Sequence, residues 1–356
     1  MSETPDQSPA HGAHGRSPST ADRWASIKRS PFLPAFVLVL ILAAAAALFA
    51  GSYTYSMANP TPHHIPTAVV GQAGSPEGKR FIGGMEKALN ASLELRPYDS
   101  EGAARRAVDE QEVFAVLAVR PAGVRLDVTG ASGSSVAQLL AESGTKVGKA
   151  TGVPVQVRDV KPLQPGDPRG LALFYISLAA VIIGFVGAIQ LSVHASALNP
   201  AERIAFTAFY ALLGGFTIAA TVDWLLGAVR LPFVESWLIL ALTMFTSGMV
   251  FSMFNVLLRR WAMIPTWGLM VLLGNPSSGG AVSWPLLPSL LGHIGRWLPP
   301  GASVTAQHTA VYYGGHQHLF PFAVLGAWAL VSSAVFWFWR HRHPGGRPGS
   351  GAHAAH

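Results

Sequence analysis

The chain has 356 residues, of which 50% are hydrophobic and only 12% are charged. The charged share is about half of that in an average globular domain, so the composition excludes a disordered chain and argues against a fully soluble protein. The absence of cysteine excludes disulfides, cysteine-ligated metal sites and thiol nucleophiles. The net charge of +7 fits a membrane better than a nucleic acid, because the basic residues cluster at the ends of apolar runs.

The first segments of the chain are predicted to lead into a membrane anchor. Residues 1–20 are rich in Ser, Pro, His and Gly, which predicts a disordered tail. Residues 21–30 are expected to form a short interfacial helix, with Asp22 as its N-cap and basic side chains facing lipid head groups. Residues 31–53 are the first apolar run long enough to cross a bilayer. Its apolar core exceeds that of a signal peptide, so we interpret it as a retained first span.

The polar stretch at residues 61–168 predicts one α/β domain inserted between the first and second spans. Strands are expected at residues 65–70, 93–98, 113–119, 124–128 and 153–160, and helices at residues 79–95, 102–112 and 134–149. The first of these helices is amphipathic, with Phe81, Met85, Leu89 and Leu93 on one face. The third and fourth strands are predicted to pair as a hairpin.

Residues 171–340 predict a membrane domain of five spans, which gives six spans with the first one. The apolar runs lie at residues 171–192, 204–226, 236–258, 261–273 and 319–339, and the run at 261–273 is short. The fold class is therefore an α-helical polytopic membrane protein with an inserted α/β domain. Residues 341–356 are expected to be a disordered tail.

The positive-inside rule predicts that both termini are cytoplasmic and that residues 61–168 are extracytoplasmic. In this orientation the tails and inner loops carry Arg16, Arg23, Lys28, Arg29, Arg203, Arg259, Arg260, Arg340, Arg342 and Arg347. The two short outer loops carry Arg230 and Arg296. The excess of Arg over Lys, 19 against 6, with abundant Ala, Gly and Pro, is typical of a GC-rich bacterial genome, so we expect a bacterial inner membrane.

Asp223 is the one acidic residue placed inside an apolar run, near the outer end of the third span. A carboxylate there indicates a candidate intramembrane polar site. The alternative is that Asp223 reaches water or pairs with Arg230. The predicted spans offer no ionisable group near the membrane midplane, which argues against an ion-coupled transporter.

The segment at residues 274–305 alternates helix breakers with short apolar pieces. Irregular backbone at membrane depth must be buried in protein or line a wet cavity. We therefore interpret the segment as an outer gate or re-entrant hairpin, and the alternative is an amphipathic loop on the outer surface. The candidate gate residues are Asn275, Pro276, Ser277, Ser278, Gly279 and Gly280.

No constellation in the sequence predicts catalysis, a cofactor or a metal. Two Gly-Lys pairs, at residues 78–79 and 148–149, lack the first glycine of a phosphate-binding loop. His316 and His318 have metal-binding side chains, but the spacing supplies no third ligand. We therefore expect no enzymatic activity.

The order of these elements resembles that of a known family. A single span, a domain that opens with IPTAVV and five further spans are similar to the YhgE/Pip-like branch of the type-two ABC exporter permeases. The GNPSSGG segment, followed by LLPSLL and RWLPPGASV, resembles the region between the last two spans of that family. The segment EGAARRAVDEQEVFAVLAV resembles the helix–strand unit of its outer domains. The resemblance covers about residues 21–340.

The resemblance implies a homodimeric permease that works with a separate nucleotide-hydrolysing subunit. The loop at residues 193–203 occupies the position of the family's coupling helix, which makes Asn199, Pro200, Glu202 and Arg203 the candidate ATPase-coupling residues. Residues 21–30 occupy the position of the connecting helix.

The expected function is that of an ABC-type export permease for an apolar or amphiphilic molecule. Its expected partners are the lipid bilayer, an ATPase subunit and a second copy of the chain. The main alternative is a membrane-anchored scaffold or receptor whose outer domain binds envelope or secretion proteins. A weaker alternative is an ion-coupled efflux transporter that uses Asp223.

Overall fold

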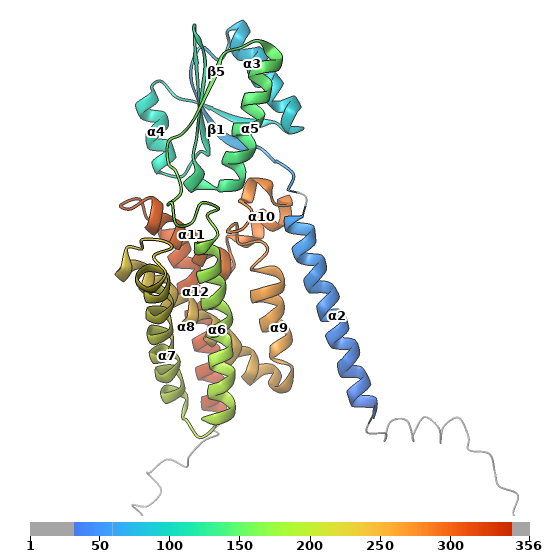
Figure 1. Ribbon diagram of the computed structural model, residues 1–356. Coiled ribbons are helices and arrows are strands. Elements are labelled where there is room, and N and C mark those ends of the chain that lie inside the picture. Colours follow the sequence, from blue (N-terminus) through green and yellow to red (C-terminus); the bar gives the residue numbers. More distant parts are fainter. Residues whose placement is uncertain (1–31, 59, 344–356) are drawn as a thin grey trace, which may run out of the picture. The chain divides into compact units, whose positions relative to one another are not determined.

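The computed structural model describes residues 32–58 and 60–343 and shows a mainly helical protein with one small mixed sheet (Figure 1). The chain divides into two compact units, Met1–Ala50 and Gly51–His356. The described part of the first unit belongs to helix α2, Phe32–Met57, which is apolar on every face. This helix is long and apolar enough to cross a membrane, and it extends beyond the predicted span at 31–53.

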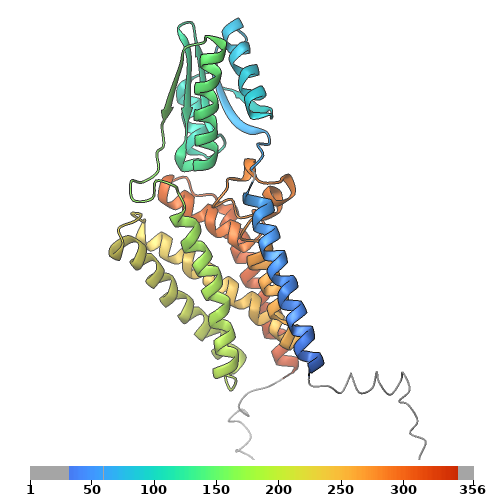
Figure 2. The ribbon, with the colours of Figure 1, turned by 45° about the vertical axis from the view of Figure 1, so that its right-hand side comes forward.

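The second unit contains an α/β domain with a five-stranded sheet in the order β2-β1-β3-β4-β5 (Figure 2). The strands are β1 Ile65–Gly71, β2 Leu93–Pro97, β3 Ala115–Arg120, β4 Gly123–Val128 and β5 Val155–Asp159. Strand β1 runs parallel to β2 and β3, β3 and β4 form the predicted antiparallel hairpin, and β5 is parallel to β4.

Helices cover both faces of this sheet. Helices α3, Pro76–Leu89, and α5, Ser134–Thr151, pack on one face, where Phe81 and Leu140 join Leu117 of β3 in the main core. Helix α4, Glu101–Asp109, covers the other face, where Ala104 and Val108 contact a smaller core. Because both faces are covered, β1 carries a continuous run of buried residues, as expected for a central parallel strand.

The predicted helix at residues 79–95 is wrong at both ends. Helix α3 begins at Pro76, after an N-cap at Ser75 whose side chain accepts a hydrogen bond from the Gly78 amide. It ends at Leu89, because Asn90 adopts a left-handed conformation with φ of 50°. Leu93 therefore lies in β2, and it reaches the same core from the sheet rather than from the helix.

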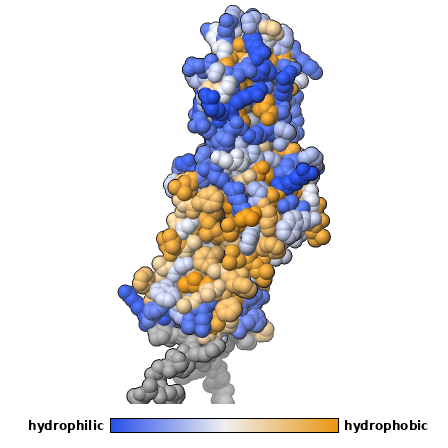
Figure 3. All heavy atoms as spheres, turned by 90° about the vertical axis from the view of Figure 1, so that its left-hand side faces the viewer, coloured by the Kyte–Doolittle hydropathy of each residue, from blue (hydrophilic) through white to orange (hydrophobic). Residues whose placement is uncertain are grey.

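The rest of the second unit is a helical bundle centred on α8. Its longer helices are α6 Ala172–His194, α7 Pro200–Ala220, α8 Phe233–Leu258, α11 Pro299–Tyr312 and α12 Leu319–Arg342. Helix α8 packs against the other four, and most of its apolar segment is buried. Figure 3 shows apolar side chains gathered over this bundle and mainly hydrophilic ones over the α/β domain.

Five described helices, α2, α6, α7, α8 and α12, are long and apolar enough to cross a membrane, against the six predicted spans. The predicted short fifth span corresponds to α9, Met263–Trp267, which continues as a π-helical turn, Gly268–Leu273. This apolar stretch is shorter than the others. The predicted tail at residues 1–20 and interfacial helix at residues 21–30 lie outside the described residues. The predicted tail at residues 341–356 begins too early, because α12 continues to Arg342.

The connection from β5 to α6 joins the α/β domain to the bundle. The Asp167 carboxylate accepts hydrogen bonds from the amides of Leu171 and Ala172, at 3.0 and 2.9 Å, and so satisfies amides at the start of α6. Gln164 exchanges two hydrogen bonds with the backbone of Arg230, in the loop between α7 and α8. The polar connector is therefore held at a defined place against the bundle.

We expect close helix packing at Gly184 of α6 to be essential for the bundle. A Cβ atom at this position would lie 2.6 Å from the Met244 carbonyl oxygen of α8, which cannot move without moving the helix. Gly184→Ala is therefore expected to destabilise the protein by about 1–3 kcal/mol and to lower its Tm in detergent.

Gly326→Ala in α12 is the matched control, because no atom lies within 4 Å of a Cβ added there. We expect it to change the stability by no more than about 1 kcal/mol. An equal Tm for both variants would contradict the predicted contact between α6 and α8.

Candidate functional site

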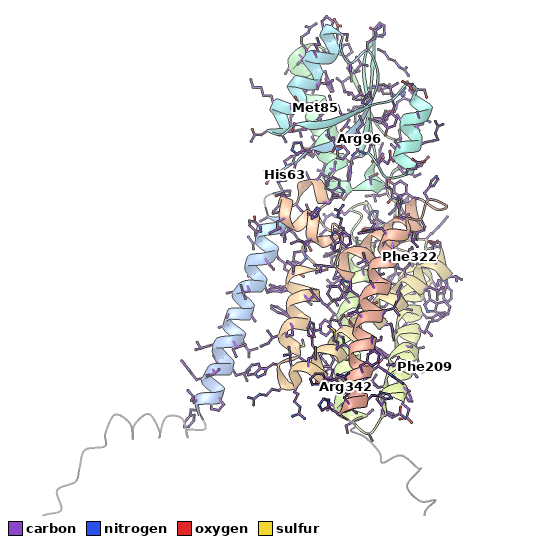
Figure 4. All side chains as sticks on the ribbon, turned by 180° about the vertical axis from the view of Figure 1, so that it is seen from behind. His63, Met85, Arg96, Phe209, Phe322 and Arg342 are labelled. Carbon is purple, nitrogen blue, oxygen red and sulfur yellow. The ribbon has the colours of Figure 1, made fainter. Side chains whose placement is uncertain are left out.

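A cavity of about 650 Å³ lies where the α/β domain meets the bundle. Its walls come from three parts of the chain: the entry and lower edge of the α/β domain, the irregular segment after α9, and the facing parts of α11 and α12. Figure 4 shows His63, one of the lining residues, at this junction. The cavity therefore belongs to neither part alone.

The irregular segment is held against the α/β domain by apolar packing. Val282, Leu286 and Leu287 are buried in the main core of the domain. The backbone that leads into β1 continues this contact. The amides of Thr61 and His63 donate to the carbonyl oxygens of Leu286 and Pro285 at 3.2 and 2.7 Å. The segment thus acts as part of the domain's base.

Hydrogen bonds between side chains join the domain to the bundle around the cavity. The Thr309 hydroxyl of α11 donates to the Gln111 side-chain oxygen at 3.0 Å. The hydroxyl groups of Ser132 and Tyr313 share a short hydrogen bond, and those of Ser135 and Ser283 lie 3.2 Å apart. The two partners of such a bond lie up to 198 positions apart in the sequence, so these bonds fix the tertiary arrangement.

Only some of the predicted gate residues line the cavity. Residues 277–280 line the cavity, whereas Asn275 and Pro276 do not. Asn275 is buried and donates from its side-chain amide to the Tyr53 hydroxyl at 2.6 Å. Asn275 therefore anchors the gate segment, and the following serines and glycines face the cavity.

The segment at 274–305 has both buried and exposed parts. Residues 274–278 are buried, and the segment forms the short helix α10, Ser289–Gly295, before α11 begins. Helix α11 is buried along most of its length against α6, α8 and α12. The breakers allow close packing: a Cβ atom at Gly295 would overlap the Ser277 carbonyl oxygen. The start of the segment and α11 are thus buried in protein, whereas Trp284, Ser289, Leu290, His293, Arg296 and Trp297 are exposed. The gate and the surface loop both stay predictions.

The lining of the cavity is apolar with a basic component. Five histidines and one arginine line it, namely His63, His64, His293, His308, His318 and Arg296. Within the described part of the chain, no Asp or Glu contributes to this lining. A cavity with this lining suits an apolar or amphiphilic molecule and offers no carboxylate to a cation.

His308 on α11 is a lining histidine with a shifted pKa. Burial lowers its pKa to about 4, against the smaller opposing effects of a backbone hydrogen bond with Ala131 and the charge of Asp167. The imidazole is therefore uncharged at neutral pH. Nearby, burial raises the pKa of Tyr313 to about 12, so its hydroxyl keeps the proton that it shares with Ser132.

The candidate ATPase-coupling residues cap helix α7 and do not line the cavity. The Asn199 side chain accepts from the Glu202 amide, and the Glu202 carboxylate accepts from the Asn199 amide, both at 2.9 Å. Pro200 occupies the first turn. Arg203 is buried and donates to the Ala195 carbonyl oxygen at 3.2 Å. These residues give the turn between α6 and α7 a defined shape.

Asp223 does not pair with Arg230, which was one of the alternatives for this carboxylate. It lies half-buried in the π-helical turn Thr221–Leu225, and none of the ion pairs between described residues includes it. The backbone of Arg230 binds Gln164 instead. The intramembrane polar site and a carboxylate that reaches water both stay predictions for Asp223.

Helix α11 contributes to the site although no span or helix is predicted there from the sequence. Its start carries a recognisable signal, since Pro299 and Pro300 occupy the first helical positions, where proline is favoured. The following residues lack an amphipathic period because nearly all faces of this helix are buried, so periodicity gave no indication of it.

No protein-family model matches the chain, and no curated protein matches it significantly. Among the residues that the structure describes, no cluster of three or more His, Asp or Glu side chains could hold a metal ion.

We expect His308 to make the stability of the protein sensitive to acid. Because its folded pKa of about 4 lies below the ordinary value of 6.5, its penalty is absent above pH 6.5 and grows as the pH falls towards 4. The slope is at most about 1.4 kcal/mol per pH unit. His308→Gln should therefore lose less stability than the natural protein between pH 6.5 and 4, measured as Tm in detergent. His316→Gln, at an exposed loop histidine, should keep the natural profile, and parallel profiles for all three proteins would refute the assignment.

Proposed function

We propose that the chain is the permease subunit of an ABC-type exporter that moves an apolar or amphiphilic molecule outward. The observation that carries this proposal is the cavity between the α/β domain and the segment at 277–305. An apolar compartment walled by both parts can receive a molecule that leaves the bundle and pass it along the domain. The energy would come from ATP hydrolysis by a separate subunit, and the chain itself would not be an enzyme.

The proposed topology has six spans in a bacterial inner membrane, with both termini cytoplasmic. The stretch Met263–Leu273 would be the short fifth span, and the α/β domain would be extracytoplasmic. The cavity would then lie at the outer ends of the spans, and the turn at 195–203 would face the ATPase. Two copies of the chain would form the working permease, as the resemblance to type-two exporters implies.

The contacts between the two parts support export over a scaffold. A receptor domain that is merely anchored needs no shared core with its anchor, whereas Leu286 and Leu287 of the bundle segment are buried in the core of the domain. A displacement of that segment would therefore be transmitted to the domain. Ion coupling through Asp223 receives less support, because that residue is half-buried near a helix end and lines neither the cavity nor the second pocket.

The first test is to purify the tagged protein from its native membrane in mild detergent and identify bound proteins by mass spectrometry. We expect stoichiometric recovery of a nucleotide-binding subunit. Recovery of envelope or secretion proteins with no ATPase would contradict the proposal and favour the scaffold.

A second test fills the cavity. Thr305 of α11 lines it from an exposed position, so Thr305→Trp should obstruct the cavity without disturbing the core. We expect this variant to lose most of the cargo-stimulated ATP hydrolysis of the purified complex. Thr217→Trp is the matched control, because Thr217 is also exposed and also bonds to a carbonyl oxygen four residues earlier. Full stimulation in Thr305→Trp would exclude the cavity from the path.

A further inference from the structure

A second pocket, of about 360 Å³, lies at the end of the bundle where α7 begins and where α8 and α12 end. Its polar lining consists of Arg203, Asn255, Arg259, Arg260, Arg340 and His343, and we refer to it as the arginine pocket. Figure 4 shows this end of the bundle around Arg342, which follows the lining residues on α12.

Arg203 supplies a buried and incompletely paired guanidinium group. The residue is only 9% exposed, and one of its terminal nitrogens donates to the Ala195 carbonyl oxygen at 3.2 Å. Its Nε atom is buried and has no hydrogen-bond partner among the described residues. A buried N–H group without an acceptor costs free energy, and for a charged group the cost is larger. An acceptor that enters the pocket would remove that cost.

The described part of the protein supplies no carboxylate to neutralise the pocket. No Asp or Glu lines it, and none of the ion pairs between described residues involves Arg203, Arg259 or Arg260. The neighbouring Glu202 is engaged with the Asn199 amide at the helix start. Several like charges thus converge on one concave site, where repulsion disfavours the empty state.

The backbone after α8 directs two consecutive arginines to this site. Arg259 has a positive φ of 51°, a conformation that costs a non-glycine residue free energy and is typical of functional sites. The following Arg260 places its guanidinium group 5.4 Å from the ring of Trp261. The turn therefore presents exposed guanidinium groups beside the buried one of Arg203.

We propose that the arginine pocket binds the phosphate group of an anionic phospholipid. Guanidinium groups bind phosphate through paired, charge-assisted hydrogen bonds. The pocket lies at the ends of three helices that are apolar enough to cross a membrane, where lipid head groups are found. Exposed apolar residues that neighbour lining residues in the sequence, Leu257, Trp261 and Phe338, offer apolar surface for acyl chains at this end of the bundle. This assignment does not depend on the proposed export function.

The test measures the affinity of the full-length protein in neutral detergent for short-chain phosphatidylglycerol. Phosphatidylcholine of the same chain length and inorganic phosphate serve as comparison ligands. We expect phosphatidylglycerol to bind best. Arg259→Gln/Arg260→Gln should weaken its binding by about tenfold or more, because two donors of charge-assisted hydrogen bonds are lost. These two residues are exposed, so the double variant should fold, unlike a substitution of buried Arg203.

Arg342→Gln is the control, because it removes one positive charge, against two in the double variant, from an exposed residue at the same end of the bundle but outside the pocket. We expect its affinity to stay within about twofold of the natural value. An unchanged affinity in the double variant would overturn the proposal, as would equal binding of the two lipids. Inorganic phosphate that competes at the same concentration would show a free-anion site instead. If the double variant kept its lipid affinity but no longer recovered the ATPase subunit in the pull-down, the pocket would be a protein-binding site. Either of these two results would refute the lipid assignment.

Discussion

The arrangement of the second unit depends on the burial of three bundle residues, Val282, Leu286 and Leu287, in the core of the α/β domain. Burial of an aliphatic side chain of this size stabilises a protein by about 1.5–3 kcal/mol, so the three together resist separation of the two parts. The contact also requires a close approach of backbones. A Cβ atom at Gly133 would lie 2.0 Å from the Ser283 hydroxyl oxygen, so a larger residue would push the segment out.

The cavity follows from this contact. The segment at 282–287 is held by the domain, and α11 is held by α6, α8 and α12, so the residues between these two anchors enclose a space that neither fills. Hydrogen bonds such as that between Thr309 and Gln111 cross the junction beside the space, although the Nε2 atom of Gln111 is buried without a partner among the described residues. Burial keeps His308 neutral at neutral pH, whereas Arg296 brings a positive charge to the lining.

Helix α12 connects the two candidate sites. Its first residues, including Phe320 and Pro321, line the cavity, and its last turns, including Trp339 and Arg340, line the arginine pocket. At about 1.5 Å per residue, its 24 residues span roughly 36 Å, close to the thickness of a hydrocarbon core. An apolar site and a basic site separated by this distance suit a protein whose two ends meet different surroundings.

The amino-acid sequence by itself determined the features that depend on local pattern. The long apolar runs could be predicted because a helix that crosses a membrane needs about 20 apolar residues in succession. The strands along the chain and the hairpin at 121–123 could be predicted from short apolar runs separated by turn residues. The end of α3 at Leu89 could not, because the amphipathic pattern continues past a residue that adopts a left-handed conformation. Only the tertiary structure placed Ser277 and Gly280 in a cavity with His308 and brought Arg203 to Arg259, because these residues are joined by packing between distant segments. Such packing depends on which faces of the helices meet, and a single sequence carries no local signal of that choice.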